Sequence, residues 1–145
     1  MSEKNNGLRV FIDSNILLSA VLSNSSLSSK VLTLLIEEHH LIICSYSINE
    51  VTKVINRKFP DHIAKWDKFI STLEFEMAYT PENPLVFPAP YIRDEKDIPI
   101  LVSAILAEPD VLITGDYDFH TDEIREYFAV YTPGEFLRNF GNLEV

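Results

Sequence analysis

Short apolar segments alternate with amphipathic ones along most of this chain, and this alternation constrains the fold more than any other feature. Segments such as Leu41–Ser45 and Val111–Thr114 are almost wholly apolar and too short for an ordinary helix. Strands that are apolar on both faces are typical of a parallel sheet covered by helices on both sides. We therefore expect an α/β fold, a three-layer α/β/α sandwich around a central, mainly parallel sheet of roughly four to five strands.

The predicted strands and helices alternate over most of the chain. Strands are expected at 8–12, 41–45, 75–79, 111–114 and 128–131. Helices are expected at 16–22, 27–38, 47–58, 61–72, 97–107, 121–127 and 133–140. The four prolines of Thr80–Pro90 predict an extended loop. No repeat or linker interrupts this pattern, so we expect a single domain over residues 1–145 with its core at about 8–140.

Composition is that of a soluble globular protein. The chain of 145 residues is 46% hydrophobic and 23% charged, and no apolar run is long enough to cross a bilayer. Met1–Gly7 is polar and has no signal-peptide core, so the expected location is the cytoplasm. Cys44 is the single cysteine; it excludes a disulfide within the chain, and its apolar neighbours predict a buried position.

The formal net charge of −10 argues against an ordinary nucleic-acid-binding protein. Such proteins are usually basic, because neutralising phosphates supplies much of their affinity. Two interpretations remain. Either the protein does not contact nucleic acid, or its acidic residues gather where cations bind; composition alone favours the first.

Acidic residues follow several of the predicted strands. Asp13 ends the first strand, Glu50 lies early in the helix after the second, Asp97 opens the helix before the fourth, and Asp116 and Asp118 lie in the turn after it. Parallel strands bring these positions to one edge of the sheet. Two unit charges about 5 Å apart at an effective dielectric constant of 20 repel by about 3 kcal/mol, so a cluster requires protonation or a cation. Oxygen ligands without Cys or His favour Mg²⁺ or Mn²⁺, and such ions typically serve phosphodiester chemistry.

Each of these residues also has an ordinary structural explanation. Asp13 could cap the helix that follows it. Ser47 and Glu50 have the spacing of a capping box, in which Glu50 bonds back to the amide of Ser47. Asp97 could be an N-cap, and Asp116 and Asp118 suit an Asx-type turn. It is their shared position at one edge that suggests a functional site.

Four segments together resemble the PIN-domain (PilT N-terminus) family, which includes the VapC-type toxins of bacterial toxin–antitoxin systems. They are 10–17, with Asp-Ser-Asn after a strand; 45–51, with an acidic residue at a helix start; 93–104, with an Asp-led apolar helix; and 112–119, with Thr-Gly-Asp-Tyr-Asp-Phe after a strand. The last is the most specific, and the order and spacing are retained over about residues 8–140. One departure is Pro99, where an ordinary helix former is expected, so the start of that helix could differ by one residue.

The resemblance implies a Mg²⁺- or Mn²⁺-dependent ribonuclease that binds one or two ions and leaves a 5′-phosphate and a 3′-hydroxyl. The catalytic residues would be Asp13, Glu50, Asp97 and Asp116, and the metal ligands Asp13, Asp97, Asp116 and Asp118. Glu50 would help to hold an ion and orient or deprotonate the attacking water. Asp94, Asn15 and Thr114 would be auxiliary. The implied partners are RNA, a small antitoxin and a second copy of the chain in a homodimer.

Basic residues lie close to the predicted acidic site in the sequence. Lys53 and Arg57 are four residues apart and therefore share a helix face, while Arg93 and Lys96 flank Asp94. All four are candidates to contact an RNA backbone. An equally open alternative is that they pair with nearby acids on a solvated surface.

Two other functions compete with the ribonuclease. One is a catalytically weak, PIN-derived module that binds metal, RNA or protein and works through a partner. The other is a phosphatase with a phospho-aspartate at Asp13, although Asn15 stands where such enzymes usually carry a second Asp.

Overall fold

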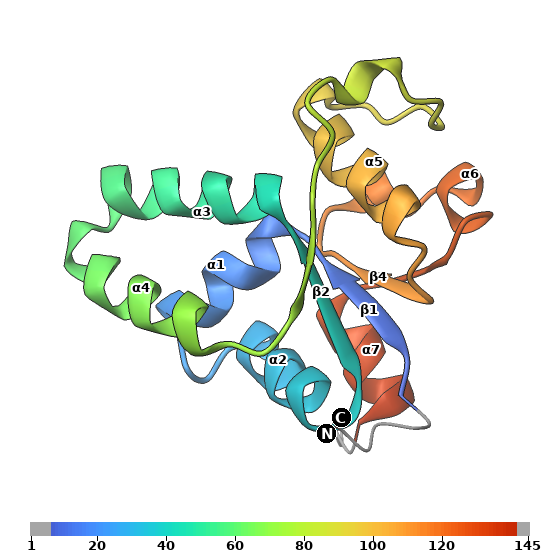
Figure 1. Ribbon diagram of the computed structural model, residues 1–145. Helices are drawn as coiled ribbons and strands as arrows, with labels where there is room; N and C mark the ends of the chain where they lie inside the picture. The colour runs from blue at the N-terminus through green and yellow to red at the C-terminus, as the bar shows by residue number, and fades with distance from the viewer. Residues whose placement is uncertain (1–6, 142–145) are drawn as a thin grey trace.

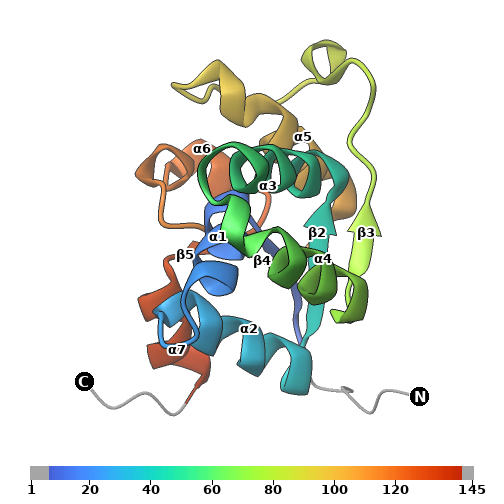
Figure 2. The same cartoon turned by 90° about the vertical axis from the view of Figure 1, so that its left-hand side faces the viewer.

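The computed structural model describes residues 7–141 and has a five-stranded sheet in the order β3-β2-β1-β4-β5 (Figure 1, Figure 2). Every neighbouring pair of strands is parallel. The strands are β1 (Arg9–Ile12), β2 (His40–Cys44), β3 (Glu76–Ala78), β4 (Val111–Ile113) and β5 (Ala129–Tyr131). The three-layer α/β/α fold expected from the sequence is confirmed.

Helices cover both faces of this sheet. They are α1 (Ser14–Leu22), α2 (Leu27–Glu38), α3 (Ser45–Lys58), α4 (Ile63–Thr72), α5 (Ile98–Ala107), α6 (Asp122–Arg125) and α7 (Pro133–Phe140). Short 3-10 turns are η1 (Pro60–His62), η2 (Pro84–Val86), η3 (Glu95–Asp97) and η4 (Tyr117–Phe119). Among the described residues, no helix is long and apolar enough to span a membrane.

The alternation of side chains along each strand creates two separate cores. In β1, Val10 and Ile12 face a core built with α1, α2, α3, α4 and α7, whereas Phe11 faces a second core built with α5 and α6. In β4, Leu112 faces the second core, whereas its sequence neighbours Val111 and Ile113 face the first core. Successive side chains point to opposite faces of a sheet, so a buried parallel strand must be apolar at every position.

The order of the strands creates a switch point between β1 and β4. The chain runs outward from β1 to β2 and β3 on one side, and then crosses through α5 to β4 on the other. Ligands of open parallel sheets bind at such a point, beyond the carboxyl ends of the strands. Here Asp13 directly follows β1 and Thr114 directly follows β4, and the amide of Asp13 donates to the carbonyl of Ile113 at 3.3 Å.

The predicted sequence of elements is confirmed, with small errors at helix starts. The helix expected from Ser47 begins two residues earlier, at Ser45, directly after β2. The helix expected from Asp61 begins at Ile63, because Pro60 opens the 3-10 turn η1 first. Asp97 is the N-cap of α5 and ends η3, and Pro99 is accommodated in the first turn of α5, where no amide hydrogen bond is lost. Residues 1–6, part of the segment predicted to lack a signal peptide, lie outside the described residues.

A pair of leucines tests the buried sheet. Leu112 is fully buried, whereas Leu85 is 67% exposed. We expect Leu112→Ala to lower the free energy of unfolding by about 2–5 kcal/mol, because it leaves a cavity next to β1. The same change at Leu85 should cost no more than about 0.5 kcal/mol. Urea denaturation measures both values, and equal losses for the two variants would contradict the packing described.

Candidate metal centre

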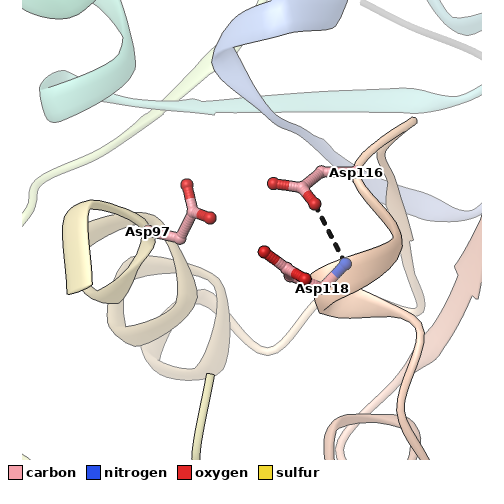
Figure 3. Close-up of side chains that lie close together, drawn as sticks. All are labelled: Asp97, Asp116 and Asp118. Atoms are coloured by element: carbon pink, nitrogen blue, oxygen red, sulfur yellow. Dashed lines mark hydrogen bonds between the residues drawn. The ribbon is translucent and has the colours of Figure 1, made fainter. Parts of the chain in front are cut away.

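Three carboxylates from two separate segments meet beyond the carboxyl edge of the sheet (Figure 3). Asp97 comes from the junction of η3 and α5, and Asp116 and Asp118 come from the turn after β4. One oxygen of each lies within 4.8 Å of one oxygen of the other two. Asp97 is far from the other two in sequence, so their approach is a result of the fold.

The environment of Asp97 opposes a negative charge. Burial, followed by the negative charge of Asp116, raises the pKa of Asp97 to about 7. Its Oδ2 atom is buried and has no hydrogen-bond partner among the described residues. A buried carboxylate oxygen without a donor is costly unless it is protonated or binds a cation. The three-carboxylate donor set and this oxygen fit a hard divalent ion such as Mg²⁺ or Mn²⁺.

Asp13 lies beneath this group rather than within it. Its side chain is only 3% exposed and accepts a hydrogen bond from the amide of Ile16 at 3.1 Å, which caps α1. The hydroxyl of Thr114 also donates to Asp13 and accepts from the amide of Asp116 at 3.0 Å. Burial, only partly offset by these hydrogen bonds, raises the pKa of Asp13 to about 6. Asp13 is thus both a helix cap and, through Thr114, a direct support for the loop that carries Asp116.

Hydrogen bonds and a buried aromatic side chain stabilise the turn that carries Asp116 and Asp118. The carboxylate of Asp116 accepts from the amide of Asp118 at 2.9 Å, in the Asx-type arrangement considered from the sequence. Phe119 is buried in the second core, and the ring of His120 bonds the carbonyl of Thr114 at 2.9 Å. These contacts fix where the two carboxylates point.

Arg93 pairs with Asp118 through two contacts. Its Nε donates to Oδ1 at 3.0 Å, and its Nη2 lies 3.0 Å from Oδ2. The hydrogen bond and the charge of Asp118 raise the pKa of the Arg93 guanidinium. The sequence left two roles open for Arg93, contact with an RNA backbone and pairing with a nearby acid. The structure contains the pairing with an acid.

The capping-box interpretation of Ser47 and Glu50 is wrong. Because α3 begins at Ser45, Ser47 lies inside the helix, and its buried hydroxyl accepts from Ser14 at 2.9 Å and contacts the sulfur of Cys44 at 3.3 Å. Glu50 is not among the three clustered carboxylates. It lies along α3 and lines a hollow of about 340 Å³ with Lys53 and Arg57.

The remaining candidate residues are not members of the three-carboxylate cluster. Asp94 accepts from the amide of Lys96 at 3.0 Å, and its charge contributes to the raised pKa of Asp97. Asn15 is exposed in the first turn of α1, and Lys96 is also exposed. Cys44 is buried, as its apolar neighbours predicted.

Tyr46 is a neighbour of the site that the sequence interpretation missed. Its hydroxyl lies 3.5 Å from the carbonyl of Lys96, and it lines the same hollow as Glu50. Burial and the charges of Glu50 and Asp97 raise its pKa. The signal was present in the sequence, because Tyr46 precedes Glu50 by four residues and therefore shares its helix face.

A comparison with protein families identifies the domain. The family model described as the PIN domain matches residues 9–118, which include Asp13, Glu50, Asp97, Asp116 and Asp118. This chain belongs to the PIN-domain family.

A solved structure shares the fold of this PIN domain. It is VapBC2 from Rickettsia felis, bound to a DNA fragment from their promoter. The TM-score is 0.59 and the sequence identity 18%, over 83% of this chain and 96% of the other. No curated protein sequence matches this chain.

The raised pKa values predict how the stability of the metal-free protein depends on pH. A carboxyl group whose pKa is higher in the folded state than in the unfolded state makes folding less favourable once it must ionise. We expect the free energy of unfolding in EDTA to fall as the pH rises from about 4, near the ordinary pKa of Asp, to about 7, the pKa of Asp97.

Asp97→Asn removes that ionisation. It should raise the melting temperature in EDTA at about pH 8 and change it less at about pH 4, where wild-type Asp97 is already protonated. The exposed Asp67→Asn on α4 is the matched control and should follow the wild-type profile. An effect of Asp97→Asn that is the same at both pH values would contradict the account.

Proposed function

We propose that this protein is a divalent-cation-dependent endoribonuclease that hydrolyses RNA phosphodiester bonds and acts as the toxin of a toxin–antitoxin pair. The observation that carries the proposal is the meeting of Asp97, Asp116 and Asp118, with one buried oxygen of Asp97 left without a hydrogen bond among the described residues. This arrangement is unfavourable for the protein alone and suits a bound cation. Membership of the PIN-domain family supports the same conclusion.

The ligands proposed for one or two Mg²⁺ or Mn²⁺ ions are Asp97, Asp116 and Asp118, with Asp13 beneath them. When bound, such an ion polarises the scissile phosphate and lowers the pKa of a coordinated water. Asp13 accepts a hydrogen bond from Thr114, and Thr114 in turn accepts one from the amide of Asp116. The role of Asp13 therefore includes holding the loop of Asp116 in position. The raised pKa of Asp97 means that ion binding must displace a proton near neutral pH, and binding should therefore weaken in acid.

Glu50 is proposed to help hold an ion and to orient or deprotonate the attacking water. Its position on the same helix face as Tyr46 supports this role, because Tyr46 contacts the segment that carries Asp97. Asp94, Asn15 and Thr114 are proposed to be auxiliary to this reaction. Products with a 5′-phosphate and a 3′-hydroxyl remain an expectation from the family.

The proposed route for the RNA backbone passes along the exposed side of α3. Lys53 and Arg57 line the hollow of about 340 Å³ together with Glu50 and Tyr46. In a chain of net charge −10, these two cations on α3 give a local attraction for phosphate that the overall charge conceals. Arg93 and Lys96 extend the set of backbone candidates to the other side of Asp97.

The proposed biological setting is the bacterial cytoplasm, with a small antitoxin protein as a partner and a second copy of the chain in a homodimer. Support comes from the shared fold with a chain of the VapBC2 complex, which is bound to a DNA fragment from its promoter. A fold likeness at 18% identity supports the setting only in combination with the site.

A cleavage assay tests the proposed activity. Purified protein is incubated with mixed single-stranded RNA in Mn²⁺ or in EDTA, and cleavage should occur only with the metal. Asp97→Asn and Asp116→Asn should each lower the rate by about a hundredfold or more, because even the outer partners of metal ligands are commonly worth about 10–100-fold. Asp67→Asn should cleave like the wild type.

Two results would contradict the proposal. Cleavage that persists in EDTA, or in both Asn variants, would show that another site or a contaminant acts on the RNA. A protein that is stabilised by Mn²⁺ and binds RNA without cutting it would support the alternative, a PIN-derived binding module.

A further inference from the structure

Arg93 holds an unusual position among the basic residues near the acidic cluster. Of the described Lys and Arg residues, it is the one that forms an ion pair with a carboxylate of the cluster. The pair is two-pronged, from Nε and Nη2 to the two oxygens of Asp118. Such a fork fixes the plane of the guanidinium as well as its location.

The partners of this pair differ greatly in exposure. The side chain of Asp118 is 19% exposed, whereas that of Arg93 is 75% exposed. A guanidinium has five N–H donors; in Arg93 the Nε–H group donates to Asp118 Oδ1, and Nη2 makes the ion-pair contact with Oδ2. Among the described residues the other donors have no hydrogen-bond partner. Ile92, the preceding residue, is buried in the second core and anchors the chain at this point.

The arrangement therefore presents a guanidinium, oriented by Asp118 and largely exposed to solvent, at the rim of the carboxylate cluster. Planar, bidentate recognition of phosphate is the chemistry for which a guanidinium is best suited, and pre-orientation by a carboxylate reduces the freedom lost on binding. Because Asp118 is one of the three clustered carboxylates, a phosphate on Arg93 would lie beside Asp97 and Asp116.

We infer that Arg93, held by Asp118, binds the scissile phosphodiester of RNA through its free N–H groups at the carboxylate cluster. The inference rests on the proposed ribonuclease function and adds to it a substrate-contacting residue and a second role for Asp118. Asp118 is then a positioning residue as well as a candidate metal ligand. The negative charge that develops on the phosphate oxygens during hydrolysis would be stabilised by the same donors.

RNA binding without turnover separates this role from the activity of the metal-loaded protein. The probe is a pool of short, fluorescently labelled, random-sequence single-stranded RNA, measured by anisotropy with Ca²⁺ in place of Mn²⁺. Arg93→Ala should weaken binding by about tenfold or more, the range expected for a hydrogen bond to a charged group. It should also reduce the slope of log affinity against log salt by about 0.7, for one lost phosphate contact on a single strand. Arg93→Lys should recover only part of the affinity, because a lysine lacks the fork.

The matched control is Arg138→Ala, which removes the same charge from the exposed last turn of α7, toward the opposite end of the molecule in Figure 1. Arg138→Ala should bind RNA like the wild type. In a second set of titrations in EDTA, where no ion is held by Asp118, Asp118→Asn should weaken RNA binding as Arg93→Ala does, and the double variant should be no weaker than either single one, because both remove the same unit.

Circular dichroism and melting temperature establish that each variant is folded. The inference is overturned if Arg93→Ala binds RNA as tightly as Arg138→Ala, because Arg93 would then be only a counter-charge to Asp118. It is also overturned if the effects of Arg93→Ala and Asp118→Asn simply add in EDTA. A wild-type protein that neither binds this RNA nor is stabilised by Mn²⁺ would overturn the proposed function and the inference together, whereas failure at Arg93 alone would leave the ribonuclease intact.

Discussion

Like charges held close together against their mutual repulsion are the constraint on which the rest of this structure depends. The carboxylates of Asp97, Asp116 and Asp118 approach within 4.8 Å, and Asp13 lies buried beneath them. The protein maintains this arrangement with rigid supports: the cap of α1, the shared hydroxyl of Thr114 and the buried Phe119. A divalent cation would convert the repulsion into attraction, so the same supports that strain the metal-free protein would preorganise a metal site.

The fold and the common location of the acidic residues could be predicted because both follow from simple periodicities. Strands such as 111–114 are apolar at every position, which indicates a sheet covered on both sides, and a parallel sheet necessarily brings its carboxyl ends to one edge. Asp13 and Asp116 follow strands that are direct neighbours, β1 and β4. Asp97 could be assigned to the same edge because its helix leads into β4.

The contacts within the site could not be predicted in the same way. A capping box at Ser47 matched the local spacing, but the packing of α3 on β2 started the helix at Ser45 and placed Ser47 inside it. Arg93 precedes α5 in the chain and Asp118 follows it. No local sequence pattern indicates that these two residues pair. The burial of Asp13 and the unpaired oxygen of Asp97 likewise depend on how the helices and loops pack at the carboxyl edge of the sheet. Tertiary packing decided each of these details, whereas local pattern decided the order of the elements.

The most direct test of the account is a crystal structure of the protein with Mn²⁺ at a pH above the pKa of Asp97, with the ion located by its anomalous scattering. The account predicts a peak bounded by Asp97, Asp116 and Asp118, with carboxylate oxygens at about 2.1 Å from it. A well-ordered site without such a peak, or an ion bound elsewhere while these three carboxylates remain apart from it, would contradict the claim that the fold brings them together to share a cation.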